Sequence, residues 1–319
     1  MNLLTKFDIV CKRVFGYVFY PGYLVRKRIT IPISKKWSNT PKPLVGASYN
    51  LFDGEELLED SILSIRKAVQ HISVVFQVRS HWGNAHPNPN MIRDLENLKQ
   101  RGLIDSLIIF DPSRTGLDSA VDNKTFHQFD VEKRNLGIRD ALTAGCSLFI
   151  SLDSDELYSV NQFQYMVDVM TFGKYEASAV KHIQYYKSNR FIKRFSEQEY
   201  VSGIIKIGPE TKFVYNFECP YAIDPARKPN VYRYRKFRRF EIEMHHLSFV
   251  RLDIATKFVN HGAREDVKSG VDAMVNYFNA WHWPQPGMWA GNKAVSLRKI
   301  RKRVDIKTFE NLSAGNKFQ

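Results

Sequence analysis

Three carboxylates follow an apolar run in the stretch FISLDSDELY, residues 149–158. They are Asp153, Asp155 and Glu156. Like charges this close repel one another, and burying them costs free energy unless a partner neutralises them. Two explanations stand side by side: a solvated exit from a strand, or a binding site for a cation. A spacing of two residues lets both Asp side chains turn toward one ion, and their oxygens suit Mg²⁺ or Mn²⁺, which proteins commonly share with substrate phosphates.

The sequence around this stretch alternates predicted strands with predicted helices. Apolar runs predict strands over 44–48, 72–78, 103–110 and 147–153, and helical spacing of apolar residues predicts helices over 55–69, 91–101 and 131–145. A long loop is expected over 111–130. The alternation indicates an α/β domain with a mostly parallel sheet that helices cover on both faces. Such sheets bind ligands at the carboxyl ends of their strands, which is where Asp153 and Asp155 fall.

Three segments of the chain resemble one protein family. The block EKRNLGIRDALTAGCSLFISLDSDELY, 132–158, is similar to the nucleotide-sugar half of glycosyltransferases with the GT-A fold, and most of all to bacterial family 2-like enzymes with their Asp-X-Asp motif. The segment ASYNLFDGEELLEDSILSI, 47–65, resembles the first strand and helix of that family, and EMHHLSFVRLD, 243–253, resembles a late segment. The resemblance covers 43–260. It implies a GT-A-like, Rossmann-like sheet, a nucleotide-sugar donor and a divalent metal, Mn²⁺ or Mg²⁺.

The resemblance also implies a metal site. Asp153 would contact the nucleotide ribose or the metal, and Asp155 would bind the metal that bridges the diphosphate. A His after the last core strand completes the metal site in some of these enzymes. His245 and His246 point to opposite faces if they lie on a strand, so only one can face the metal. The resemblance favours His246; a core histidine is the alternative.

Two further groups of residues are candidates for donor binding. The resemblance places the base and ribose of the nucleotide near the end of the first strand, at Ser48, Tyr49, Asn50 and Asp53, with Tyr49 stacking on the base. Capping of the strand end is the alternative for Asn50 and Asp53. The second group opens the helix before the motif: Lys133, Arg134 and Asn135. Basic side chains and helix N-terminal N–H groups suit a diphosphate, although an exposed helix start explains them as well.

A catalytic base is the next requirement of an inverting transferase, which uses a carboxylate to deprotonate the acceptor hydroxyl. Glu218 and Asp224 are the candidates, because they lie between the metal motif and the late His. We favour Glu218 on the sequence. A retaining enzyme would need no such base.

The net charge of +14 is concentrated at the two ends of the 319 residues. Residues 1–42 hold nine Lys and Arg against one Asp, and 293–319 hold eight against two acids, so 43–292 is neutral overall. Apolar residues recur at helical spacing near the N-terminus, and the uncharged run there is too short to span a bilayer. We therefore expect three parts: a basic amphipathic segment over 1–42 that binds an anionic membrane surface, a GT-A-like domain over 43–292, and a basic tail over 293–319. The alternative for 1–42 is a helix packed on the protein's own body.

Three widely spaced cysteines indicate a reducing compartment.

Together these features predict a metal-dependent glycosyltransferase that works on the cytoplasmic face of a bacterial membrane. Its expected acceptor is a surface glycan: lipopolysaccharide, capsule or a lipid-linked oligosaccharide. A basic nucleic-acid-binding protein is the first alternative, and the neutral body counts against it. A nucleotidyltransferase is disfavoured because the acidic YNLFDGEE follows the first strand where a basic, Gly-rich phosphate loop would be needed. An inactive membrane-associated scaffold of the same fold is the third.

Overall fold

The computed structural model describes residues 43–80, 83–112, 123–194, 200–260, 270–289 and 293–301. The predicted membrane segment over 1–42 and most of the basic tail lie outside these residues. Within the described ranges, no helix is long and apolar enough to cross a membrane.

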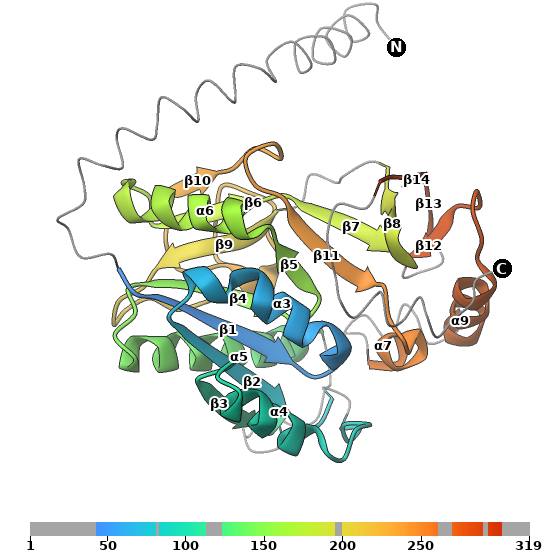
Figure 1. The fold of residues 1–319 in the computed structure, drawn as a ribbon, viewed down its shortest axis with the longest axis horizontal. Helices are drawn as coiled ribbons and strands as arrows, with labels where there is room; N and C mark the ends of the chain where they lie inside the picture. The colour runs from blue at the N-terminus through green and yellow to red at the C-terminus, as the bar shows by residue number, and fades with distance from the viewer. Residues whose placement is uncertain are drawn as a thin grey trace, which may run out of the picture. The chain divides into compact units, whose positions relative to one another are not determined.

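The first half of the described chain alternates strands and helices, as the sequence predicts (Figure 1). Its elements are β1 (Val45–Leu51), η1 (Glu55–Leu57), α3 (Leu58–Ile65), η2 (Arg66–Ala68), β2 (His71–Gln77), α4 (Met91–Gln100), β3 (Ser106–Phe110), α5 (Asn123–Thr143), β4 (Leu148–Asp153), β5 (Glu156–Tyr158) and α6 (Val160–Phe172). The loop expected over 111–130 is wrong for its second part, because α5 begins at Asn123. Phe129 in this part of α5 is buried and packs with Val75 and Phe110, which favours helix over loop.

The second half is richer in strands. Its elements are β6 (Ala177–Val180), β7 (His182–Tyr186), β8 (Ser188–Lys193), β9 (Val201–Lys206), η4 (Pro225–Arg227), β10 (Tyr234–Lys236), β11 (Met244–Phe249), α7 (Ile254–Asn260), α9 (Val271–Ala280), β12 (Gly287–Trp289), β13 (Lys293–Val295) and β14 (Leu297–Lys299).

Most of the strands form two sheets. The larger has seven strands in the order β10-β6-β9-β4-β1-β2-β3, in which only β9 runs antiparallel to its neighbours. The smaller has the order β14-β8-β7-β11-β5. The structure is therefore the predicted α/β fold, a large and mostly parallel sheet flanked by helices.

Helices cover both faces of the larger sheet (Figure 1). Apolar residues of α3, α4 and α6 pack on one face of β1, β2 and β4 in the main core, and α5 packs on the other face. The close approach of α5 to β1 depends on small residues. A Cβ at Gly46 would lie 2.7 Å from Cβ of Ala141, and a Cβ at Gly137 would overlap the side chain of Ser48. This packing fixes α5 against the strands that end at Asn50 and Asp153.

We predict that Gly137→Ala destabilises the protein although Ala is the better helix former by about 1 kcal/mol. The overlap with buried Ser48 should outweigh that gain and lower the free energy of unfolding by about 1–3 kcal/mol. Urea unfolding measures the change. Gly208→Ala is the control, because an added Cβ there meets no heavy atom within 4 Å. Equal stability of the two variants would contradict the packing.

Candidate functional site

The acidic stretch connects the two sheets. Strand β4 of the larger sheet ends at Asp153, and β5, which starts at Glu156, pairs with β11 of the smaller sheet. Asp153 is level with Asn50 of β1 at the carboxyl edge of the parallel strands. Two of the three carboxylates are therefore not a solvated exit: Asp155 and Glu156 are 3% and 2% exposed, whereas the side chain of Asp153 is 37% exposed.

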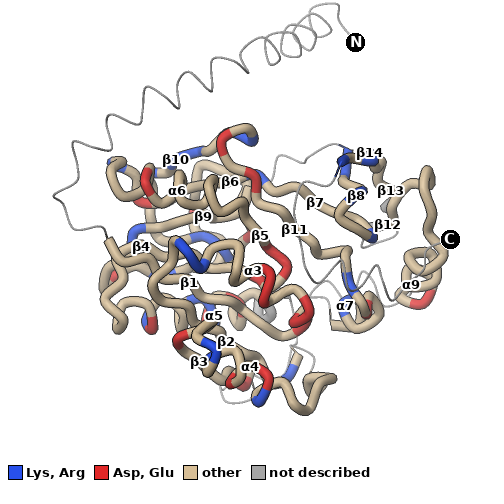
Figure 2. Tube along the Cα trace, viewed as in Figure 1, with Lys and Arg blue, Asp and Glu red and all other residues tan. Residues whose placement is uncertain are grey.

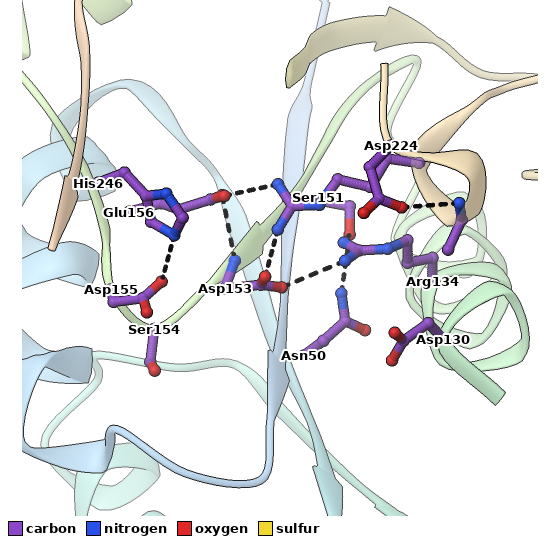
Figure 3. A network of polar contacts seen from close by, with 12 residues as sticks. Asn50, Asp130, Arg134, Ser151, Asp153, Ser154, Asp155, Glu156, Asp224 and His246 are labelled. Atoms are coloured by element: carbon purple, nitrogen blue, oxygen red, sulfur yellow. Dashed lines mark hydrogen bonds and ion pairs between the residues drawn. The ribbon is translucent and has the colours of Figure 1, made fainter. Parts of the chain in front are cut away.

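Asp153 and Glu156 share one arginine (Figure 3). The guanidinium group of Arg227, on η4, donates to Oδ2 of Asp153 and, at 2.6 Å, to Oε1 of Glu156. Arg134 of α5 donates to Oδ1 of Asp153 at 3.2 Å and to the hydroxyl of Ser151 at 2.7 Å. The backbone N–H of Asp153 donates to Oε2 of Glu156 at 3.2 Å. All four carboxylate oxygens of this pair thus have a partner within the protein.

The pKa values of these two carboxyl groups move in opposite directions. Burial disfavours the charged form of both. For Asp153 the charges of Arg227 and Arg134 outweigh burial and lower its pKa. For Glu156 burial, together with the nearby charge of Asp153, outweighs Arg227 and raises its pKa. Glu156 is therefore the member of the pair that protonates first as the pH falls.

Asp155 faces a different set of groups. Its Oδ2 accepts from Arg251 at 2.5 Å and lies 3.6 Å from Nζ of Lys257. Its Oδ1 lies 3.4 Å from Nε2 of His246 and has no hydrogen-bond partner among the described residues. Burial opposes the charged form, but Arg251, His246 and Lys257 hold the pKa of Asp155 well below its usual value. Asp155 is ionised at neutral pH, with one oxygen directed at an imidazole.

The ring of His246 is oriented by the hydrogen bond that its other nitrogen, Nδ1, makes. Nδ1 lies 2.8 Å from Oε1 of Gln184 on β7, and an amide oxygen only accepts hydrogen bonds, so Nδ1 carries the proton. With Nδ1 protonated, Nε2 either carries a second proton, which the Asp155 carboxylate attracts, or presents its lone pair to that carboxylate. Two lone pairs directed at one another repel, and a cation between them, either a proton on Nε2 or a metal ion, removes the repulsion. His245 points the other way, and its Nδ1 is hydrogen-bonded to the hydroxyl of buried Tyr185 at 2.9 Å.

Asp155 and His246 fit a divalent metal as two of its ligands. Their donor atoms are an oxygen and a nitrogen, and the bond from His246 to Gln184 is the kind of outer contact that orients a metal-bound imidazole. Among the described residues there is no cluster of three or more His, Cys, Asp or Glu side chains placed to hold a metal. The remaining ligands would therefore be substrate phosphates or water, as is common for Mg²⁺. Asp153, predicted as a further ligand, faces Arg134 and Arg227 instead.

Of the donor-binding candidates near the end of β1, two are buried in the protein interior and two lie at the site. Tyr49 is fully buried and its hydroxyl accepts from Ser61, so the prediction that its ring stacks on a base is wrong. Ser48 is also fully buried, against α5. Asn50 donates to Ser151 at 3.0 Å and belongs to the network of Figure 3. The carboxylate of Asp53 lies 3.8 Å from the guanidinium of Arg251.

The three candidates in α5 also differ in position. Arg134 binds Asp153 in the site. Lys133 is paired with Asp130 at 2.8 Å and donates to Gln77 at 2.7 Å. Asn135 exchanges two hydrogen bonds with the backbone of Phe213, which ties α5 to a loop. They lie inside α5 and not at its beginning, so the helix N-terminus proposed from the sequence as a diphosphate site is wrong.

The structure brings Asp224 near Arg227, whose positive charge its carboxylate stabilises, and Figure 3 draws it with the residues of the network. Asp224 is exposed, and its Oδ1 accepts from the backbone N–H of Ala226 at 2.8 Å, which caps η4 just before Arg227. Glu218, the base favoured from the sequence, is exposed on the preceding loop. The geometry therefore favours Asp224 over Glu218.

Sequence reasoning missed three cations of the site: Arg227, Arg251 and Lys257. They lie 71 to 102 residues beyond the carboxylates that they contact. No spacing rule connects positions that far apart. The available signal was the buried acidic stretch itself, which requires positive partners from elsewhere in the chain.

We predict that Arg227→Gln destabilises the protein in a pH-dependent way. Removing the shared partner of buried Glu156 and partly exposed Asp153 should cost roughly 3–5 kcal/mol of unfolding free energy at pH 7.5. The loss should be smaller at pH 5, because without Arg227 the pKa of Glu156, already raised, rises further and the folded state takes up a proton.

Urea unfolding at the two pH values measures both effects. Arg233→Gln is the control: its ion pair with Glu176 is exposed and should be worth about 0–1 kcal/mol. A loss in Arg227→Gln that equals the control, or that does not shrink at pH 5, would contradict this role for Arg227.

Comparison with known proteins finds similarity only among solved structures. No protein-family profile matches the chain, and no curated protein matches it. Residues 1–349 of S. aureus TarS give a TM-score of 0.36 at 10% identity, covering 74% of this chain and 72% of that one. The same TarS residues in complex with UDP-GlcNAc give 0.33 at 11% identity, with the same coverage.

A third structure is GalNAc-T7 with UDP, GalNAc and Mn²⁺, with a TM-score of 0.32 and 12% identity over 56% of this chain. The chain spans 29% of the length of GalNAc-T7 and 42% of a matched mycobacterial protein. All these TM-scores lie below 0.5. A functional conclusion therefore rests on the site at Asp155 and His246 and on the Asp-X-Asp motif at 153–155.

Proposed function

We propose that the protein is a glycosyltransferase that uses a nucleotide-sugar donor together with a divalent metal ion. The observation that carries the proposal is the pairing of Asp155 Oδ1 with His246 Nε2 at 3.4 Å, at the carboxyl edge of a mostly parallel sheet. This edge is where α/β folds bind their ligands. The resemblance of 132–158 and 243–253 to GT-A glycosyltransferases supports the same assignment.

The charges around this pair suit a diphosphate. Arg251 and Lys257 form ion pairs with Asp155, and Arg134 and Arg227 form ion pairs with the neighbouring Asp153. A bound metal would neutralise part of the charge that develops on the departing nucleoside diphosphate. The protein's own cations would add to that stabilisation from fixed positions.

Asp224 is the proposed general base. A hydroxyl of the acceptor attacks the anomeric carbon of the donor sugar, and its proton moves to the Asp224 carboxylate. The new bond joins the acceptor oxygen to that carbon. The bond from the carbon to the phosphate oxygen breaks, and the nucleoside diphosphate leaves with the electron pair. Attack on the face opposite the leaving group inverts the configuration.

The proposed acceptor and location rest on the positive charge of the two terminal segments, which lie mostly outside the described residues. The basic segments over 1–42 and 293–319 would hold the enzyme on an anionic membrane, on its cytoplasmic face. A surface glycan under construction there, such as lipopolysaccharide, capsule or a lipid-linked oligosaccharide, is the proposed acceptor. The segment NVYRYRKFRRF, 230–240, alternates basic and aromatic residues as a nucleic-acid-binding strand could. It gives that alternative no support, because Arg233, Arg235 and Arg239 are paired with Glu176, Glu241 and Glu243.

We predict that one nucleotide sugar raises the melting temperature only when Mn²⁺ is also present. A ligand at 100 times its Kd adds about 2.7 kcal/mol to the stability of the folded state, which is a shift of several degrees. Asp155→Asn and His246→Gln should abolish the shift. Asp94→Asn, on α4, is the control and should retain it. A panel of UDP-, GDP-, CDP- and dTDP-sugars that gives no shift in the unmodified protein would refute the function.

We predict that Asp224→Asn lowers kcat about 100-fold or more, since a general base contributes that much. The Kd for the donor should not change, because an Asn oxygen can still cap Ala226. Glu218→Gln should keep its activity. Steady-state kinetics with the identified donor, and direct titration of that donor, measure the two quantities. Full activity of Asp224→Asn would assign the base to another group.

A further inference from the structure

Two aromatic rings stack on each other at the outer part of the smaller sheet. The indole of Trp283, in the loop between α9 and β12, is stacked on the ring of Phe191 in β8, with centroids 5.6 Å apart and an interplanar angle of 19°. Trp283 is 40% exposed. Because Phe191 covers one face of the indole, the exposed area belongs to its edge and its other face. Such a face packs well on a sugar ring, whose C–H bonds carry the slight positive charge that an aromatic face attracts.

The loop that carries Trp283 is held in place by its neighbour Trp281. Nε1 of Trp281 donates to the carbonyls of Gln285 at 3.1 Å and of Pro286 at 3.0 Å. Trp281 is itself 7% exposed, and its ring packs against Phe191 at 5.0 Å in a T-shaped arrangement. The position of the Trp283 indole is therefore set before a ligand arrives, which lowers the entropy cost of binding.

The stacked pair lies on the side of the smaller sheet that carries His246. Ile192 of β8 is paired with Tyr185 of β7, whose hydroxyl is hydrogen-bonded to His245. Side chains alternate along a strand, so Phe191 points to the opposite side, as His246 does. Only β7 separates β8 from β11, so these two strands are roughly 10 Å apart. An acceptor chain whose hydroxyl reacts near His246 can therefore extend to the stacked pair.

Positive charge surrounds the stacked pair. Residues 187–194, 281–289 and 293–301 hold four Lys, four Arg and no Asp or Glu. Figure 2 shows basic positions on β8 and β14. Lys299 of β14 is exposed and directly opposite Phe191, so its side chain lies on the same side of the sheet as the pair. This charge would attract a carboxylate or a phosphate on a saccharide and would add little to the binding of a neutral one.

We propose that Trp283, stacked on Phe191 and flanked by Lys299, binds an acidic sugar residue of the acceptor at a distance from the site of sugar transfer. This inference rests on the proposed function, because it names the chemical class of the acceptor. The indole packs on the sugar ring, and Lys299 pairs with the carboxylate or phosphate that the sugar carries. An anionic membrane also suits exposed Trp and Lys side chains. The shared side of the sheet with His246 favours the saccharide.

The test is isothermal titration calorimetry of the full-length protein with acidic oligosaccharides. The probes are hexamers of galacturonate, of sialic acid and of hyaluronan, and pentamannose phosphate, with maltohexaose as the neutral comparison. At least one acidic probe should bind about tenfold more tightly than maltohexaose, and its affinity should fall as NaCl rises from about 50 to 500 mM. Trp283→Ala should weaken that binding about tenfold, and Trp283→Phe should keep most of it. Lys299→Gln should weaken it about threefold and reduce its dependence on salt.

Tyr232→Ala is the matched control, because Tyr232 is 68% exposed and its ring lies 5.2 Å from that of Phe217. It should bind the probes as the unmodified protein does. The inference is overturned if no acidic probe binds, or if Trp283→Ala binds as tightly as the control. It is also overturned if Trp283→Ala loses affinity for phosphatidylglycerol vesicles and none for the saccharides, because the surface then belongs to the membrane.

The same variants are tested for the metal-dependent shift in melting temperature that a nucleotide sugar produces. Trp283→Ala should keep this shift, which shows that the variant is folded and that its donor site is intact. A donor that binds, without any acidic saccharide that binds, overturns this inference and leaves the proposed function standing. If no nucleotide sugar binds and Trp283 still binds an acidic probe, the proposed function fails, and with it the acceptor role, but not the saccharide site.

Discussion

The structure depends on one electrostatic constraint, the burial of a run of carboxylates between the two sheets. Asp155 and Glu156 are almost completely buried, and Asp153 carries charge beside them. Removing such groups from water is costly unless cations at close range compensate. The compensating residues come from four separate segments: Arg134 in α5, Arg227 in η4, Arg251 after β11 and Lys257 in α7. Distant parts of the chain are thereby tied to three carboxylates within residues 153–156.

The same cluster has a fully satisfied half and an incompletely satisfied half. The carboxylates of Asp153 and Glu156 are satisfied within the protein, because planar guanidinium groups offer the paired donors that suit them. Asp155 is different, since its Oδ1 lies 3.4 Å from Nε2 of His246 and has no hydrogen-bond partner among the described residues. A site with one rigid side and one incompletely satisfied side can hold an exchangeable ligand without losing its shape. This division explains why the predicted metal ligands Asp153 and Asp155 have different surroundings.

The sequence predicted the parts that local patterns determine. Apolar runs and helical periodicity were sufficient for the strands β1, β2 and β4 and hence for the edge where Asp153 lies. Alternation along a strand was sufficient to separate His245 from His246, and β11 carries them on opposite sides. The sequence could not predict the partners Arg227, Arg251 and Lys257, because ion pairs between residues 71 or more positions apart leave no periodic signal. The prediction that Tyr49 stacks on a base was wrong because alternation along β1 directs Tyr49 into the main core.

The most direct test of the metal and diphosphate site is anomalous X-ray diffraction from crystals soaked with Mn²⁺ and, in turn, UDP, GDP and CDP. The account predicts one manganese peak between Asp155 Oδ1 and His246 Nε2, with diphosphate oxygens completing its coordination and Lys257 turned toward them. A peak at another position, or a nucleotide bound at this edge with no manganese near Asp155 and His246, would contradict it.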